Sequence, residues 1–301
     1  MSRQLGDLIS LTTYDGERRY IPSGGLRILA YGNFGAPPVE WITSRGYRQH
    51  GATVLDFFTQ PRTVTLELYQ TGACGRQQYW DSRAELINLL RPNRGGPLKL
   101  TVRTPNGNQR ALYVRPDPGL ILPPVEPTVN NWAVQEAIDL IAHDPIWFDP
   151  ESIDLVTEGT IGDDLIFPIT FPIAFGLSGL RFIFNQVYRG TWESFPVFEI
   201  DGPYDSALFI NEATGARFQL MLPISSGERR IVDLTPGRQS VTDSMGINRF
   251  GELAPNSNLV QFSLQPDPIV PGGAQQIHVI LSGATADTRV TIHYFERYFG
   301  I

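Results

Sequence analysis

Short alternating segments, each closed by a turn signal, recur along the second half of the chain. From Leu180 onward the turns come about every ten residues, as at Gly202-Pro203 and Pro236-Gly237. Breaks at this spacing leave room for strands of roughly four to eight residues but not for helices of ordinary length. This half of the chain therefore predicts a β-sandwich without a helix.

Glycine and proline punctuate the first half in the same way. The chain of 301 residues holds 29 Gly and 24 Pro with no short repeat, a distribution typical of many turns between short strands. Hydrophobic residues make up 42% and charged residues 18%, which excludes an intrinsically disordered chain. At about 150 residues per domain, this length indicates two domains with a core each. We expect a mostly β protein.

One helix interrupts the β pattern of the first half. Thr53 to Tyr69 is rich in β-branched and aromatic residues and predicts one half-buried strand. From about Arg76 to Arg91 the apolar residues follow helical spacing, until Pro92 and Gly95-Gly96 end the run. We expect a single helix over this range, packed on a sheet.

The segment from Pro97 to Arg115 predicts a β-hairpin. The residues Thr104-Pro105-Asn106-Gly107-Asn108 fit a type I turn followed by Gly107 in the left-handed conformation. That register sets Leu100 opposite Leu112 on the buried face, whereas a strict two-residue loop would set two arginines opposite each other. We therefore expect the bulged hairpin, projecting from the first domain.

Trp132 to Ala142 fits two structures. Its apolar residues alternate as in a strand, but Ala133, Ala137 and Leu140 also suit a helix. We predict a strand here, and Trp147-Phe148 is expected to close the first domain.

Proline-rich stretches indicate where the domains end. We expect residues 1–152 to form the first domain and residues 181–301 the second. Residues 153–180 contain the repeat Phe167-Pro168-Ile169 and Phe171-Pro172-Ile173, which predicts an extended linker.

Charge and hydropathy argue against two kinds of partner. The net charge is −7 with a pI near 5.2, so no global positive field attracts a phosphate backbone, and we expect no nucleic-acid specificity. Met1 to Ser10 lacks the apolar core of a signal peptide. Leu165 to Leu180 is uncharged but is broken by prolines and shorter than the roughly 20 residues that span a bilayer, so we expect no membrane insertion.

Motif searches give no catalytic residue. Cys74 stands alone before the predicted helix with no identifiable base beside it, and a small buried side chain is the expected role. Carboxylates such as Glu193 and Glu199 form no motif for glycoside hydrolysis, which would require a pair converging in a cleft. Nucleophile-elbow and phosphate-loop sequences are absent. We expect a protein that is not an enzyme and has no cofactor.

The histidines give no metal site. His278 and His293 are expected on the two strands of a final hairpin, Ile277–Leu281 with Val290–Phe295, where alternation places both on one sheet face. Zinc requires three or four ligands at close spacing, which the chain does not offer. Solvated strand histidines are the expected outcome.

Aromatic residues near turns of the second half provide candidate contacts. Trp192, Tyr204 and Phe209 lie where rings could stack on a sugar or on a protein partner. We therefore name them as candidate glycan or partner contacts.

In combination, several segments resemble the distal tail protein family of siphophages over nearly the whole chain. They are the helix after Thr71-Gly72, the hairpin around Pro105-Asn106-Gly107, His143-Asp144-Pro145-Ile146-Trp147-Phe148, the doubled Phe-Pro-Ile segment, Ser194 to Gly202, and Gly227-Glu228 with Ile231-Val232-Asp233.

The resemblance implies a fold and a role. It implies an N-terminal, β-sandwich-like belt domain that closes into a hexameric ring, and a galectin-like C-terminal β-sandwich. The ring would be a structural part of the phage baseplate or tail tip, assembled in the host cytoplasm and carried in the virion. Its partners would be the tail tube and tape-measure proteins on one side and hub, fibre or receptor-binding proteins on the other. The alternative is an adhesion module whose C-terminal sandwich binds host-surface glycans.

Overall fold

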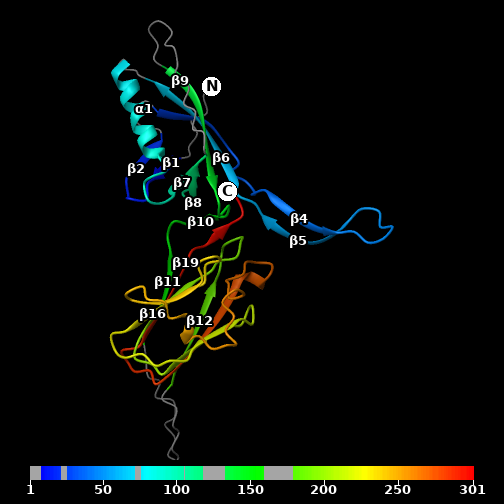
Figure 1. Cartoon of the computed structure of the whole chain (residues 1–301), viewed down its shortest axis with the longest axis vertical. Helices are drawn as coiled ribbons and strands as arrows, with labels where there is room; N and C mark the ends of the chain where they lie inside the picture. Colours follow the sequence, from blue (N-terminus) through cyan, green and yellow to red (C-terminus); the bar gives the residue numbers. More distant parts are fainter. Residues whose placement is uncertain (1–7, 22–25, 72–75, 105, 118–132, 159–178) are drawn as a thin grey trace, which may run out of the picture. The chain divides into compact units, whose positions relative to one another are not determined.

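The structure is a computed structural model that describes residues 8–21, 26–71, 76–104, 106–117, 133–158 and 179–301 (Figure 1). As expected, it is mostly β. Two compact units make up the chain: residues 1–150 with 298–301, and residues 151–297.

In the first unit the strands follow the order β2-β1-β7-β8-β9-β6-β3 in one sheet. Two short strands extend this sheet: β10 pairs with β8, and β20 pairs with β10. Their bounds are β1 Leu8–Thr12, β2 Arg18–Ile21, β3 Leu26–Gly32, β6 Arg62–Thr71, β7 Leu98–Arg103, β8 Gln109–Pro116, β9 Ala133–Ala142, β10 Trp147–Phe148 and β20 Arg297–Tyr298. Val64, Leu66 and Leu68 alternate toward a core that also takes Leu100 and Leu112 from the β7–β8 side. Strands β6, β7 and β8 therefore share one hydrophobic core.

The predicted helix is confirmed as α1, Arg76–Leu90. Its Leu86, Leu89 and Leu90 lie in the core of the first unit. The strand prediction for Trp132 to Ala142 is also confirmed, because β9 pairs along its length with β6.

The register of the β7–β8 hairpin is confirmed as well. Leu100 pairs with Leu112, and the amide of Thr104 donates to the carbonyl oxygen of Asn108 at 2.9 Å. Gly107 has φ +91°, a left-handed conformation that glycine adopts without a steric penalty. The hairpin does not project, however, since β1 pairs with β7 and β10 pairs with β8.

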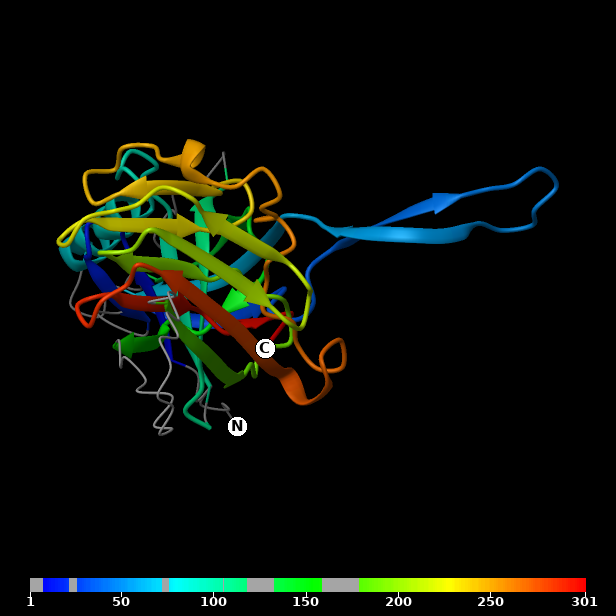
Figure 2. The same cartoon turned by 90° about the horizontal axis from the view of Figure 1, so that it is seen from below.

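The element that projects is a different hairpin, formed by β4, Val39–Ser44, and β5, Thr53–Thr59 (Figures 1 and 2). We call residues 39–59 the arm. The prediction of one strand from Thr53 to Tyr69 was wrong, because Gln60-Pro61 separates β5 from β6. Pro61 has no amide hydrogen and restrains the residue before it, which breaks the strand.

The second unit is a β-sandwich, as predicted. One sheet has the order β11-β19-β13-β16-β17 and the other β12-β18-β14-β15. The bounds are β11 Ile153–Glu158, β12 Gly179–Val187, β13 Val197–Asp201, β14 Ser206–Asn211, β15 Arg217–Leu220, β16 Arg229–Asp233, β17 Ser240–Asp243, β18 Ala274–Ser282 and β19 Arg289–Tyr294. The helical elements described here are two short 3-10 turns, η1 Phe250–Glu252 and η2 Pro271–Gly273.

Two expectations for this unit are corrected. The prediction that Ile277–Leu281 and Val290–Phe295 form a final hairpin was wrong. The corresponding strands β18 and β19 belong to different sheets, and the chain crosses the sandwich between them. The two ends of the expected linker at 153–180 are strands of the sandwich and not extended linker: β11 pairs with β19, and β12, which begins at Gly179, pairs with β18. The Phe-Pro-Ile repeat lies outside the described residues, and residues 298–301 belong to the first unit.

Candidate assembly interface

The arm is a two-stranded antiparallel ribbon whose side chains are exposed along most of its length. Trp41 pairs with Phe57 and Glu40 with Phe58, and the register shifts by one residue between Ile42 and Thr43. In both views it extends away from the sheet of the first unit (Figures 1 and 2). A two-stranded ribbon is marginally stable by itself in water.

One face of the arm is apolar. Trp41 and Phe57 share it with Val39, and the two rings lie 5.5 Å apart between centroids. Trp41 is 58% exposed and Phe57 39% exposed, and Val54 and Leu55 further along β5 are exposed too. Exposed apolar side chains gathered on one element in this way suit a site where another protein binds. We call this surface the apolar face of the arm.

The opposite face of the ribbon is mixed. Here Glu40 pairs with Phe58 and Ile42 pairs with Asp56. The side-chain amide of Gln60 donates to the carboxylate of Glu40. This face therefore carries the charges of the two strands beside the exposed Phe58 and Ile42.

The tip of the arm is basic. Arg45, Arg48 and His50 lie in the loop between β4 and β5, which holds no acidic residue. Tyr47 is 92% exposed, and the guanidinium of Arg48 lies 5.4 Å from its ring centroid. In a chain of net charge −7, this loop is a local exception that suits an acidic partner surface.

A buried arginine holds the base of the arm. Arg62 is 1% exposed and donates to the main-chain carbonyl oxygens of Gly35 at 2.8 Å and Asn33 at 3.2 Å. Its other terminal nitrogen donates to the carbonyl oxygen of Phe299 at 3.1 Å. Burial lowers the pKa of Arg62 to about 10, so the guanidinium stays charged at neutral pH. The segments that enter and leave the arm are therefore tied to each other.

Aromatic packing completes this base. The ring of Phe34 stacks on Tyr31 at 4.3 Å and meets Trp147 edge-on at 5.3 Å, while the indole nitrogen of Trp147 donates to the carbonyl oxygen of Phe34 at 3.1 Å. The amide of Ile301 donates to the same oxygen at 3.2 Å. Hydrogen bonds and ring packing thus hold together the base from which the exposed ribbon extends, and an ordered base lowers the cost of binding.

No family model and no curated protein sequence matches the chain. Among solved structures, the crystal structure of the SPP1 Dit protein matches with a TM-score of 0.61 and 11% identity, over 96% of this chain and 98% of that chain. That protein is described as a paradigm of the hub adsorption apparatus in phages that infect Gram-positive bacteria. The chain has the fold of a phage tail hub protein.

Two structures of the phage p2 baseplate in its activated conformation carry the same hub fold. The one with Ca matches with a TM-score of 0.56 and the one with Sr with 0.54, each at 10% identity over 98% of this chain and 99% of that chain. The hub fold therefore extends over both units.

Two of the three aromatic residues predicted as contacts are not on the surface of this hub fold. Tyr204 is 1% exposed and Phe209 is 0% exposed, and both belong to the core of the second unit. Phe209 stacks on Phe218 at 4.6 Å. Trp192 is partly exposed, and its carbonyl oxygen accepts a hydrogen bond from the Tyr188 hydroxyl. Tyr204 and Phe209 are therefore not available as glycan or partner contacts, because their rings form the sandwich core.

The histidines also lie apart. His278 is on β18 and His293 on β19, so they belong to different sheets and do not share a face. His293 Nδ1 lies 2.8 Å from Asp154 Oδ1, and His278 Nε2 lies 3.7 Å from Glu212 Oε1. Within the described ranges, no three His, Cys, Asp or Glu side chains are arranged to hold a metal ion. Cys74 lies outside these ranges.

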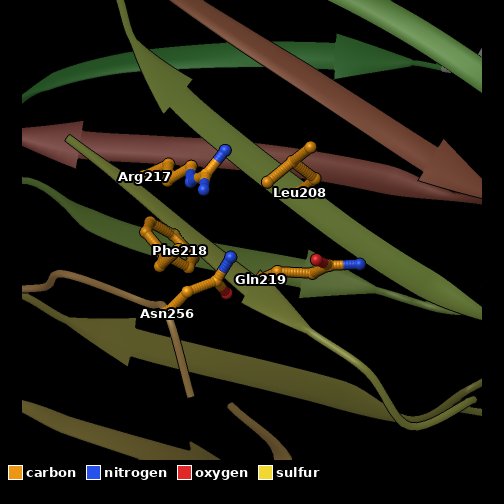
Figure 3. Close-up of a pocket in the computed structure, with 5 residues that line it drawn as sticks. All are labelled: Leu208, Arg217, Phe218, Gln219 and Asn256. Carbon is orange, nitrogen blue, oxygen red and sulfur yellow. The ribbon is translucent and has the colours of Figure 1, made fainter. Parts of the chain in front are cut away.

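Figure 3 shows a pocket in the second unit lined by Leu208, Arg217, Phe218, Gln219 and Asn256. Arg217 is the ionisable side chain among these five, so the lining has no acid and base that converge. In the part of the chain described here, no helix is both long and apolar enough to cross a membrane.

The sequence interpretation missed the arm. A usable signal was present: Pro37-Pro38 and Pro61 bracket two apolar stretches, around Trp41-Ile42 and around Phe57-Phe58, on either side of a polar loop with glycines. Read together, these features predict a separate hairpin.

Proposed function

We propose that the chain is a structural subunit of a phage tail tip, without catalytic activity, that assembles through its arm into a closed hexameric ring. The observation that carries this proposal is the apolar face of the arm, with Trp41 and Phe57 exposed on a rigidly based ribbon. Exposed apolar surface of this extent is costly in water unless a partner covers it.

A ring follows from the kind of interface that an arm makes. A projecting element docks on a different surface of the next copy, so the contact is heterologous, and such contacts close into rings when the rotation allows. Obligate interfaces are large and apolar, which fits the composition of the arm.

The proposed partners follow from the similarity to hub and baseplate proteins. The ring would join the tail tube and tape-measure proteins to hub, fibre or receptor-binding proteins, in a virion assembled in the host cytoplasm. The likeness to the SPP1 Dit protein and to the p2 baseplate supports a location at the tail tip. Glycan binding by the second unit loses its support with the burial of Tyr204 and Phe209.

The test compares the wild-type protein with the double variant Trp41→Ser/Phe57→Ser. Native mass spectrometry should give a hexamer for the wild type and a monomer for the variant, with unchanged circular dichroism because both side chains are solvent-exposed. Leu29→Ser is the control, since Leu29 is an exposed apolar residue of the first unit outside the arm. A double variant that assembles like the wild type would refute the role of the arm.

A further inference from the structure

The outward face of α1 carries an apolar stripe that is exposed in the part of the first unit that the structure describes. Trp80, Ala84 and Ile87 follow each other at helical spacing on one side of the helix. Trp80 is 43% and Ile87 44% exposed, whereas Leu86 and Leu89 point to the core. We call Trp80, Ala84 and Ile87 the helix stripe.

Two carboxylates flank the helix stripe. Asp81 and Glu85 are exposed and four residues apart, so they lie on the same side of α1. Asp81 accepts a hydrogen bond from the Gln77 side chain at 2.9 Å, and Glu85 pairs with Arg19 at 2.7 Å. The Glu85 side chain remains 64% exposed. Since a carboxylate accepts several hydrogen bonds, both retain capacity for a further cation.

The arm and the helix stripe are complementary in chemistry. The arm offers an apolar face beside a tip with Arg45 and Arg48, and α1 offers an apolar stripe beside Asp81 and Glu85. Trp41 and Phe57 on the arm and Trp80 on α1 are partly exposed aromatic residues, the residue type that anchors the centre of many protein interfaces. Docking of the arm on the helix stripe would therefore combine apolar contact with pairing of opposite charges.

The two surfaces also lie on opposite sides of the first unit. In Figure 1 α1 is on one side of the sheet and β4–β5 extends from the other, and the cyan helix and blue arm keep that arrangement in Figure 2. The chain from Pro38 to Arg48 can extend roughly 30 Å at about 3.3 Å per residue, so the arm can reach a neighbouring copy. Surfaces on opposite sides suit head-to-tail assembly.

Other exposed aromatic residues of the first unit are already engaged. The ring of Tyr14 lies against Gly96, that of Tyr20 beneath the guanidinium of Arg18 at 4.7 Å, and that of Tyr113 on Phe148 at 5.0 Å. Trp80 of the helix stripe also has a ring neighbour, since it meets Tyr79 edge-on at 5.5 Å, but Trp80 and Ile87 still remain 43% and 44% exposed.

We propose that the arm of one copy docks on the helix stripe of the next, so that α1 is the receiving surface in the ring. This inference rests on the proposed function, since it names the partner surface of the same arm. The apolar face packs on Trp80 and Ile87, and Arg45 and Arg48 lie near Asp81 and Glu85.

The test uses two variants that each lose one half of the contact. The stripe variant Trp80→Ser/Ile87→Ser keeps its arm, and the arm variant Trp41→Ser/Phe57→Ser keeps its helix stripe. Serine has a helix propensity similar to those of Trp and Ile, so α1 should persist. Each variant alone should be monomeric by native mass spectrometry, and an equimolar mixture should form a one-to-one dimer and nothing larger.

The mixture also controls for folding, because a dimer requires an intact arm on the stripe variant and an intact helix on the arm variant. A stripe variant that still forms the wild-type assembly would overturn this inference, and so would a mixture without dimer at the highest soluble concentration. A wild-type protein that is itself monomeric would instead refute the proposed function. The two failures are therefore distinguishable.

Discussion

The guanidinium of Arg62 donates a hydrogen bond to the carbonyl oxygen of Phe299 across 237 positions of sequence. Arg62 begins β6, separated from the arm by two residues, and Phe299 belongs to residues 298–301, which are part of the first unit. The same guanidinium donates to Gly35, on the segment that leads into the arm. The base of the arm is therefore built from three distant parts of the chain.

Replacing the arginine tests this base. Arg62→Met should lower the free energy of unfolding of the first unit by about 2–4 kcal/mol, because several buried carbonyl groups lose a charged donor. Denaturant titration followed by tryptophan fluorescence reports the change, since Trp147 lies beside the site. Arg91→Met, at an exposed position, should change stability by less than about 0.5 kcal/mol. Equal effects of the two variants would contradict the role of Arg62.

Gly300 tests the contact between the last residues and the arm base. A Cβ at position 300 would lie 2.8 Å from the main-chain carbon of Gly35, so Gly300→Ala should push the two segments apart. We expect a loss of about 1–3 kcal/mol, as for overpacking, and weaker assembly in analytical ultracentrifugation. At Gly32 nothing lies within 4 Å of an added Cβ, so Gly32→Ala is the control. If both variants assemble alike, the last residues do not support the arm.

The second unit contains a buried ion pair whose disruption should strongly destabilise it. Arg230 Nε lies 2.8 Å from Glu252 Oε2, with both side chains less than a tenth exposed. Glu252→Gln leaves a buried cation without its partner, so we expect a loss of about 3–5 kcal/mol. Glu199→Gln, which breaks the more exposed pair with Arg229, should cost under about 1 kcal/mol. Calorimetric melting of both variants gives the comparison, and similar melting temperatures would contradict it.

The hydrogen bond between Asp154 and His293 should make the stability of the second unit depend on pH. The hydrogen bond from His293 lowers the pKa of Asp154 below its usual value of 3.8. A carboxyl group whose pKa is lower in the folded state than in the unfolded state stabilises the folded state above pH 3.8. This stabilisation is lost as the pH falls through the folded-state pKa of Asp154. The melting temperature of the wild type should therefore exceed that of Asp154→Asn at pH 6, and the difference should shrink below pH 3.8. A difference that stays constant down to the lowest pH tested would contradict this link.

Local chemistry explains why parts of the fold were predictable. The turn at Gly107 was correct because only one register avoids a like-charge pair and gives glycine the positive φ. The end of α1 was correct because proline and glycine stop a helix wherever it packs. Neither argument depends on residues far away in the sequence.

Features that depend on long-range contacts were not predictable. The alternation of β18 and β19 is the same whether they pair or face each other across a sandwich, so the expected hairpin was wrong. Ser206 to Asn211 is apolar on both faces, and the sequence does not show that Phe209 points inward. The arm was missed because its apolar residues have no cover within their own unit, and a periodicity argument assigns such residues to a core.

The oligomeric state of the wild-type protein tests the central claim most directly. Native mass spectrometry combined with negative-stain imaging should show a hexamer with a central opening, maintained on dilution. A monomer over the whole accessible concentration range, or an open filament instead of a closed ring, would contradict assembly of this hub fold into a ring through its arm.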